Sequence, residues 1–236
     1  MKFNIGGFTH KGTGKYMVNE DQVLINRTKV EEGELFLYDQ EMCYCFVSDG
    51  VGGRQGGVFA STFLILMLRG IPDDQFAEIN QRLYTINEEL IRQASKSSDL
   101  TGCACTLSGM VSKEGFTDFY HVGDSEIWLL RDEMLMKITK DEVLNEDDPS
   151  SPITNYFGGE ENKFKINTEW NKPEIVEKDV FLICSDGLFK SIGVKIIKPI
   201  LASDKSVEEK VLKLKENCLK KGADDNVSAI VVEVLN

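Results

Sequence analysis

The sequence predicts an α+β fold in which antiparallel β-sheets are covered by helices on the outside. The order of the expected elements supports this, because strands come first, two helices follow, then many strands, and finally a helix and a last strand. Strict alternation of strands and helices would instead indicate a parallel sheet. The length of 236 residues suffices for one domain with a substantial core, so we expect a single domain over 1–236.

Six segments have the character of strands, because they are rich in β-branched and aromatic residues or alternate apolar and polar side chains. No repeat or low-complexity tract interrupts the chain, and the most loop-like stretch is "EDDPSSP" at 146–152. The expected strands are 43–48, 103–111, 116–122, 126–131, 180–185 and 227–234.

Three segments are expected to be helices. A helix over 206–221 has a capping box of Ser206 and Glu209 at its start and Gly222 as its C-cap. A helix over 57–69 is apolar nearly all round, so we expect it to be buried. The third covers 76–96, where apolar residues recur at spacings of three or four, namely Phe76, Ile79, Leu83, Ile86, Leu90 and Ala94.

The charge balance excludes some classes of function. Acids outnumber bases by 39 to 27, and no Lys/Arg-rich stripe is present to neutralise phosphates, which argues against a nucleic-acid binder. The excess of acid either serves solubility or includes a carboxylate cluster that metal ions neutralise. The longest apolar stretch, 58–68, is too short to span a bilayer, and the N-terminus lacks an apolar targeting segment. We therefore expect a cytoplasmic protein with no membrane partner.

The cysteines are expected to fill the core. Two Cys-x-Cys pairs raise the possibility of a zinc site, but structural zinc sites usually have wider spacing. On a strand, residues two apart face the same side, so each pair fits a core face. No cysteine is followed by the x5-Arg of a cysteine phosphatase loop. The six are Cys43, Cys45, Cys103, Cys105, Cys184 and Cys218.

Six acidic residues border apolar strand-like segments, and most have Gly or Asn beside them. Each alone could be an ordinary turn former. Together they would repel one another unless cations neutralised them, and hard cations such as Mg²⁺ or Mn²⁺ prefer oxygen ligands. The set comprises Glu20 and Asp21 in "VNEDQVLI", Asp49 in "SDGVGG", Asp124 in "HVGDSEIW", Asp186 in "CSDGLF" and Asp225 in "GADDNVSAIVV".

These blocks, in this order, resemble the metal-dependent Ser/Thr protein phosphatases of the PP2C (PPM) family in their compact bacterial form. Seven blocks in the right order, across almost the whole chain, are a far more specific signal than any single one. They are "NED", "VSDGVGG", "TGCACTLSGMV", "FYHVGDSEIWLLRD", "PITNYFGGE", "ICSDGLF" and "GADDNVSAIVVEV".

The resemblance implies two antiparallel sheets packed face to face as a sandwich, flanked by helices on both sides, with a two-metal centre at one end. It assigns the catalytic and metal-binding role to Asp49, Asp186 and Asp225. Asp49 would bridge both ions, the carbonyl of Gly50 would bind one of them, and the other two aspartates would complete the shell of the first ion.

The remaining acids are assigned by the same resemblance. Glu20 and Asp21 would hold the second ion, largely through water, and Asp124 matches the aspartate that holds a third ion in bacterial members. Asn226 would orient its neighbour. The implied cofactors are two Mn²⁺ or Mg²⁺ ions, with a third at Asp124.

The implied reaction is hydrolysis of phosphoserine and phosphothreonine by a bridging water that two ions activate, with no protein nucleophile. The implied partners are phosphorylated proteins and a cognate Ser/Thr kinase, and a monomer is expected. A binding-only pseudophosphatase is the alternative, but it would be expected to have lost at least one of these acids, and none is missing. A calcium-binding module is a weaker reading, because no D-x-[DN]-x-[DN]-G loop is present.

The chain departs from the family pattern in three places. The arginine that usually grips the substrate phosphate is replaced by Tyr16, and the adjacent Lys15 is either its substitute as a point charge or an ordinary loop lysine. Glu126 stands where "GDSR" is commoner. The segment between "TKDEV" and "PITNYFGG" is short, so the flap beside the active site is expected to be trimmed.

Overall fold

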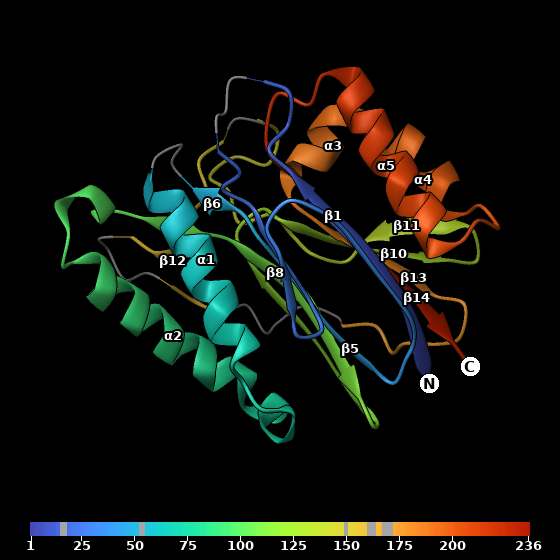
Figure 1. Ribbon diagram of the computed structural model, residues 1–236, viewed down its shortest axis with the longest axis horizontal. Helices are drawn as coiled ribbons and strands as arrows, with labels where there is room; N and C mark the ends of the chain where they lie inside the picture. Colours follow the sequence, from blue (N-terminus) through green and yellow to red (C-terminus); the bar gives the residue numbers. More distant parts are fainter. Residues whose placement is uncertain (15–17, 52–54, 149–150, 160–163, 167–171) are drawn as a thin grey trace.

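The computed structural model describes residues 1–14, 18–51, 55–148, 151–159, 164–166 and 172–236. Two antiparallel sheets lie at the centre of the molecule, with helices on either side (Figure 1). The six-stranded sheet has the spatial order β11 (Met134–Lys137), β10 (Glu126–Arg131), β13 (Val180–Cys184), β14 (Val227–Leu235), β1 (Lys2–His10) and β4 (Gly33–Gln40).

The other sheet has five strands, and a small third sheet lies beside it. The five-stranded order is β3 (Thr28–Val30), β2 (Gln22–Ile25), β5 (Met42–Ser48), β8 (Leu107–Lys113) and β9 (Phe116–Val122). The small sheet consists of β12 (Phe157–Gly158), β7 (Ala104–Cys105) and β6 (Gly50–Val51). The two antiparallel sheets and their outer helices confirm the predicted fold class.

Helices cover the outer face of each large sheet. Those against the five-stranded sheet are α1 (Gln55–Arg69) and α2 (Ile79–Ala94), with the short 3₁₀ turns η1 (Asp73–Glu78) and η2 (Ser98–Leu100). Those against the six-stranded sheet are α3 (Asp186–Ile192), α4 (Val194–Leu201) and α5 (Val207–Lys221).

Three apolar layers hold these elements together, because each sheet is buried on both faces. Val23 of β2 and Ile230 of β14 belong to the layer between the sheets. Leu64 of α1 lies in the layer beneath α1 and α2, and Leu214 of α5 lies in the layer beneath α3, α4 and α5. The strand ends therefore stand on a rigid, fully packed frame.

The expected strands are all present, and one of them is interrupted. The segment 103–111 divides into β7 and β8 at Thr106, so its first part joins the small sheet instead of the five-stranded one. The helix expected over 76–96 begins at Ile79, because the residues before it form the 3₁₀ turn η1 after Pro72. Its predicted apolar face is buried throughout.

The helix α5 has the predicted ends. The Ser206 hydroxyl accepts a hydrogen bond from the Glu209 N–H at 3.2 Å, and the Glu209 side chain accepts from the Ser206 N–H in return. Gly222 follows with φ of 73°, the left-handed conformation of a C-cap glycine. Both expectations are confirmed. The two caps fix the ends of α5, and the chain continues from Gly222 toward β14.

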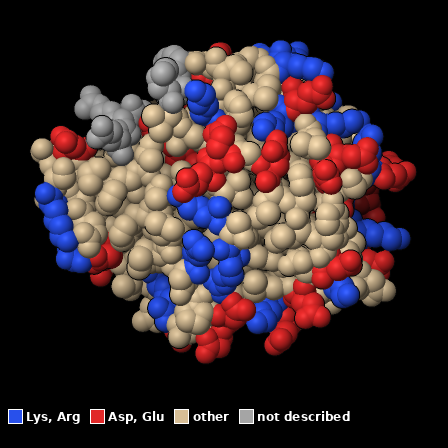
Figure 2. Space-filling model, viewed as in Figure 1, with Lys and Arg blue, Asp and Glu red and all other residues tan. Residues whose placement is uncertain are grey.

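The expectation that the apolar helix 57–69 is buried is wrong for one of its faces. This helix, α1, lies in the outer layer, and its side chains Leu66 and Met67 are 47% and 41% exposed. A helix packed on one sheet can bury only the stripe that faces the sheet. Figure 2 shows that the surface over α1 carries few charged side chains in this view.

All six cysteines are buried and free, which confirms that they fill the core. Cys43 and Cys45 both face the layer between the sheets, and Cys103 and Cys105 both face the layer beneath α1 and α2. Each pair thus lies on one side of its strand, as a spacing of two requires. Within the ranges that the structure describes, no helix combines the length and the apolar character needed to cross a membrane.

Candidate functional site

Six acidic residues lie at one end of the sandwich, where strands begin or end, and five of them, the aspartates, act on one another electrostatically. We call this group the carboxylate cluster. Its members are Glu20 and Asp21 before β2, Asp49 between β5 and β6, Asp124 between β9 and β10, Asp186 at the start of α3, and Asp225 before β14.

The strand register explains why the cluster gathers at one end. Gln22 pairs with Ser48, so the chain segments before β2 and after β5 leave the five-stranded sheet side by side. In the six-stranded sheet, Cys184 pairs with both Glu126 and Ala229. The end of β13 therefore meets the beginnings of β10 and β14, and their flanking aspartates share one edge.

Asp49 is held through its backbone. Its N–H donates to the hydroxyl of Thr106 at 3.0 Å, and the N–H of Thr106 donates to the Asp49 carbonyl at 2.8 Å. The Thr106 hydroxyl also lies 2.6 Å from the hydroxyl of Ser125, the residue after Asp124. The interruption between β7 and β8 thus supplies the residue that links the Asp49 and Asp124 loops.

The repeated "SDG" also uses its serine. The Ser48 hydroxyl donates to the Thr106 carbonyl at 2.7 Å, next to Asp49. The Ser185 hydroxyl donates to Oδ2 of Asp21 at 2.7 Å, which ties the start of α3 to the start of β2. Both serines are fully buried, so the first motif is anchored beside its own aspartate and the second is tied to Asp21.

Asn226 fastens the segment before β2 to the start of β14. Its side-chain oxygen accepts from the Glu20 N–H at 2.8 Å, and its amide nitrogen donates to the carbonyls of Lys11 and Val18 at 3.0 and 3.3 Å. Its own N–H donates to Oδ1 of Asp225 at 2.8 Å. Asn226 therefore contacts the Asp225 carboxylate directly and holds Glu20 through its backbone.

Glycine allows the backbone segments of the site to approach closely. A Cβ on Gly187 would lie 2.1 Å from the Asn226 carbonyl oxygen, so the glycine of the second "SDG" brings Asp186 against the Asp225 segment. A Cβ on Gly57 of α1 would lie 2.2 Å from Oε2 of Glu20 and 3.0 Å from the backbone of Gly50.

Burial and like charge dominate the electrostatics of Asp49. Its pKa is raised well above the usual value, first because the carboxyl is buried and then because four negative charges surround it. They belong, in order of effect, to Asp21, Asp186, Asp124 and Asp225. A carboxylate from each of the other strand ends therefore acts on Asp49.

The pKa values of two more members of the cluster are also raised. Burial raises the pKa of Asp21 to about 7, against the hydrogen bond from Ser185. Burial also raises the pKa of Asp124 to about 7, with the charge of Asp186 adding to the effect and that of Lys190 opposing it. The cluster thus favours its neutral forms unless positive charge is supplied.

The donor set of the cluster suits a hard cation. Its ligands are all oxygens, the type that Mg²⁺ and Mn²⁺ prefer. Oδ1 of Asp21 is buried, and no hydrogen-bond partner for it occurs among the described residues. In the same part of the chain, no three Asp, Glu, His or Cys side chains already form a group that could hold a metal ion. A cation would have to draw the carboxylates together.

The expected departures from the family pattern have different outcomes. Lys15 and Tyr16 lie outside the described residues. Glu126 is neutralised locally, because it accepts from Lys137 Nζ and from Trp128 Nε1, both at 2.6 Å. It is therefore paired separately from the carboxylate cluster.

Lys190 is the charged neighbour that the sequence analysis missed. It lies in α3, one turn after Asp186, and its ammonium forms an ion pair with the Asp186 carboxylate. The available signal was the spacing of four residues, which places two side chains on the same helix face. That signal needs α3 to be recognised as a helix, and the sequence analysis did not predict α3.

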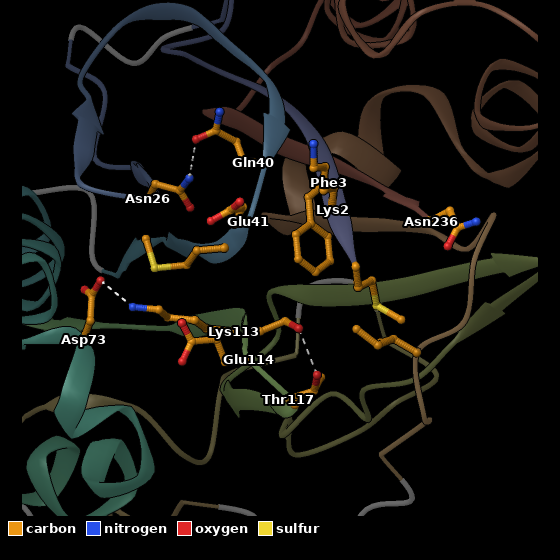
Figure 3. Close-up of a pocket in the computed structure, with 15 residues that line it drawn as sticks. Lys2, Phe3, Asn26, Gln40, Glu41, Asp73, Lys113, Glu114, Thr117 and Asn236 are labelled. Carbon is orange, nitrogen blue, oxygen red and sulfur yellow. Dashed lines mark hydrogen bonds and ion pairs between the residues drawn. The ribbon is translucent and has the colours of Figure 1, made fainter.

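A pocket in the described part of the chain lies away from the carboxylate cluster. It has a volume of about 700 Å³ and is lined by residues such as Lys2, Gln40 and Lys113, at the opposite ends of the strands (Figure 3). It therefore shares no residue with the carboxylate cluster.

The comparisons with known proteins all point to one protein family. Residues 34–217 match the family model described as protein phosphatase 2C. The serine/threonine protein phosphatase PstP of Mycobacterium tuberculosis is 27% identical over 206 residues, which cover 80% of this chain and 40% of PstP. The serine/threonine phosphatase stp of Listeria monocytogenes is 25% identical over 236 residues, which cover 90% of this chain and 93% of stp. The chain thus spans less than half the length of the mycobacterial relative.

Solved structures share the fold. The serine/threonine phosphatase PstP/Ppp of M. tuberculosis superimposes with a TM-score of 0.80 at 24% identity, and the match covers 100% of both chains. Its catalytic domain in complex with two manganese ions gives a TM-score of 0.79 at 24% identity, covering 100% of this chain and 99% of that one. PppA of Pseudomonas aeruginosa gives 0.78 at 23% identity, covering 99% and 98%.

Proposed function

The chain belongs to the protein phosphatase 2C family, and from this premise we propose that it hydrolyses phosphoserine and phosphothreonine in proteins with the help of divalent cations. The observation that carries the proposal is the carboxylate cluster. Strand ends of both sheets bring buried and half-buried acids to one place, where removal from water, and then their charges, raise the pKa of Asp49 well above its usual value. Proteins rarely bury like charges without a cation to offset them.

We assign the cluster residues to two ions, Mn²⁺ or Mg²⁺. Asp49 contacts both, and the Gly50 carbonyl binds one. Asp186 and Asp225 complete the shell of the first ion, for which their strand ends already meet through Gly187. The other carboxylates are assigned to the second ion, largely through water, and they are Glu20 and Asp21. The chemistry that two such ions supply is neutralisation of the phosphate and activation of water for attack on phosphorus.

The chain's own residues position this chemistry. Thr106 holds the backbone on both sides of Asp49, and Asn226 holds Glu20 and Asp225 in register. Ser185 directs one oxygen of Asp21 and leaves the other facing no described donor. The cysteines are buried, and burial raises the pKa of the Cys105 and Cys184 thiols, so neither supplies a thiolate nucleophile.

The remaining assignments are proposals on the same footing. Lys15 is the candidate contact for the substrate phosphate in place of the missing arginine. The partners are phosphorylated proteins and a cognate Ser/Thr kinase, and the protein acts as a cytoplasmic monomer formed by one domain. A binding-only role is less favoured, because all six acids of the cluster are present.

The test is hydrolysis of an aryl phosphate and of a phosphothreonine peptide, with and without Mn²⁺. The expected result is turnover of both substrates that requires Mn²⁺ or Mg²⁺ and disappears with EDTA. Asp73→Asn serves as the control, because Asp73 is partly exposed at the opposite end of the molecule. Equal rates in chelator, or no hydrolysis of either substrate at any concentration of Mn²⁺, would contradict the proposal.

A further inference from the structure

Glu142 is joined at two points to the turn that carries Asp124. The Glu142 N–H donates to the Gly123 carbonyl at 2.8 Å, and the Gly123 N–H donates to Oε2 of the Glu142 carboxylate at 2.9 Å. Gly123 immediately precedes Asp124, between β9 and β10. Glu142 therefore holds both backbone polar groups of the residue before a member of the carboxylate cluster.

The same carboxylate oxygen of Glu142 also holds Asn155. The Asn155 Nδ2 donates to Oε2 of Glu142 at 2.7 Å and to the Lys165 carbonyl at 2.6 Å, and the Asn155 Oδ1 accepts from the Lys165 N–H at 3.1 Å. Asn155 is buried. Its amide thus pairs with the Lys165 backbone in both directions and has one hydrogen left for Glu142, which links Lys165 to the Asp124 turn.

Glu142 also closes the base of the short segment between "TKDEV" and "PITNYFGG". The Glu142 carbonyl accepts from the N–H and the hydroxyl of Thr154, at 2.7 and 2.9 Å. Val143 forms a β-bridge with Ile153, one residue further out. Leu144 beyond it is 75% exposed, so apolar packing does little to hold the outer part of the segment. The hydrogen bonds of Glu142 are what attach this segment to the Asp124 turn.

A recess lies beside these contacts. It has a volume of about 570 Å³, and Glu142, Asn155 and Lys165 are among the residues that line it. Because Glu142 is bonded to the residue before Asp124, the recess borders the carboxylate cluster at that turn. A phosphorylated side chain that enters the cluster carries polypeptide on both sides, and this polypeptide must lie on the surface next to the cluster. The recess has the size of an ordinary ligand site.

We propose that Glu142 is a positioning residue for polypeptide substrates, because it fixes the recess against the Asp124 turn and the recess takes the chain beside the phosphorylated residue. The inference rests on the proposed function, since it names the part of a phosphoprotein that this site holds beyond the phosphate. An aryl phosphate has no such chain, so its hydrolysis depends on the carboxylate cluster alone.

A carboxylate suits this role. An ionised oxygen accepts several hydrogen bonds, and these are stronger than those to a neutral acceptor. Removing the Glu142 side chain takes this acceptor from Gly123 and Asn155 and lets the recess move away from the Asp124 turn. The rest of the cluster should stay in place, because Thr106 holds Asp49 and Asn226 holds Asp225 from other directions.

The test compares a small substrate with a polypeptide substrate. Steady-state kinetics with Mn²⁺ are measured on the aryl phosphate and on a phosphothreonine peptide with several residues on each side, for the wild type, Glu142→Ala and Glu142→Gln. Glu142→Gln keeps an oxygen that can accept both hydrogen bonds. Glu89→Ala is the matched control, because the Glu89 carboxylate also accepts from two side chains, Arg92 and Gln93, but lies on α2.

The expected result is a split between the substrates. In Glu142→Ala, KM for the peptide should rise by at least about tenfold, while kcat and KM for the aryl phosphate stay within about threefold of the wild type. Glu142→Gln should recover most of the loss, and Glu89→Ala should change neither substrate. Asn155→Ala cuts the same link from its other side and should show the same split, so it decides the matter if Glu142→Ala does not fold.

A second measurement is independent of metal and of turnover. Hydrogen exchange of the Gly123 amide, followed by NMR in EDTA, should be faster in Glu142→Ala than in the wild type, because the amide loses its acceptor. Circular dichroism checks that each variant keeps its fold.

The outcomes separate the two proposals. Equal losses on both substrates, an unchanged KM for the peptide, or unchanged exchange of the Gly123 amide would overturn the role of Glu142 and leave the phosphatase intact. A loss in Glu142→Gln as large as in Glu142→Ala would also overturn it, since the hydrogen bonds would then not be the cause. No Mn²⁺-dependent hydrolysis of either substrate by the wild type would overturn both proposals.

Discussion

The two ends of the sandwich treat charge in opposite ways. The same strands run between them: β5 begins at Met42 beside the pocket of Figure 3 and ends at Ser48 beside Asp49. At the pocket end, acids and bases pair, since Asp73 forms ion pairs with both Arg27 and Lys113. Hydrogen bonding from Arg27, above all, lowers the pKa of Asp73. At the cluster end, carboxylates face carboxylates.

The contrast shows what distinguishes a reactive site from a recess in the surface. The pocket end has a cavity of about 700 Å³, but its charges are mixed and partly exposed. The cluster end has buried and half-buried acids whose pKa values are raised by removal from water and by one another. Perturbed ionisation of this kind is relieved by protonation or by a bound cation, and it indicates function better than cavity size does.

The strongest test of the contrast is to remove one charge from each end. Asp49→Asn keeps the side-chain size but removes the negative charge assigned between the two ions, so kcat with Mn²⁺ should fall by orders of magnitude. Asp73→Asn should leave kcat unchanged and cost at most about 1 kcal/mol of stability, as is typical of exposed ion pairs. Steady-state kinetics with the aryl phosphate provide the measurement. Equal losses of kcat in both variants would contradict the difference between the two ends.

A smaller but still clear effect should follow from the close backbone approach at the cluster end. In Gly187→Ala the new methyl group would lie 2.1 Å from the Asn226 carbonyl oxygen, so the segments of Asp186 and Asp225 must separate. We expect the free energy of unfolding to fall by about 1–3 kcal/mol and the affinity for Mn²⁺ to weaken.

The matched control is Gly70→Ala, since a Cβ at Gly70 would meet nothing closer than 3.4 Å. Urea unfolding and Mn²⁺ titration of both variants provide the comparison. An unchanged stability and metal affinity in Gly187→Ala would mean that the close approach does not position the carboxylates.

Without metal, the two ends should also respond to pH in opposite directions. The pKa of Asp21 is about 7 in the folded chain and 3.8 in its ordinary state, so the folded state binds the proton more tightly. The contribution of Asp21 to stability is therefore lost as pH rises from about 4 to about 7. Asp73 has a lowered pKa, so its contribution is present above pH 3.8 and is lost as pH falls below that value.

The measurement is urea unfolding in EDTA between pH 5 and 8 for the wild type and Asp21→Asn. The variant should lose less stability than the wild type as pH rises through this range. His121, whose pKa is lowered by burial to about 4, acts in the opposite direction below pH 6.5, but it is present in both proteins and cancels in the difference. Parallel curves for the two proteins would contradict the raised pKa of Asp21.

The sequence predicted the cluster end better than the frame that supports it. Aspartates beside glycine at the ends of apolar strands are visible as local patterns, and the register then brings them together. The strand β1 was missed, because Gly6 and Gly7 at its centre disfavour strands locally. Pairing with β14 on one side and β4 on the other overrides that local preference.

Other features depend on contacts that no local pattern records. The division of one apolar segment into β7 and β8 follows from the hydrogen bonds that Thr106 makes with Asp49. The exposed face of α1 follows from its place in the outer layer, since its sequence is apolar on nearly every side. The position of Lys190 beside Asp186 could not be predicted, because it depends on the helix α3, which the sequence analysis did not identify.

The most direct test of the central claim is a set of melting curves for the wild type and Asp49→Asn, in EDTA and in Mn²⁺. Removing one of several facing charges should leave the Tm in EDTA equal or raised. The wild type should gain stability from Mn²⁺, and the variant should lose most of that gain, because ligand binding stabilises only the form that binds it. If Asp49→Asn keeps the same Mn²⁺-dependent shift in Tm and near-normal turnover, Asp49 is an ordinary turn residue and the carboxylate cluster is not a metal centre.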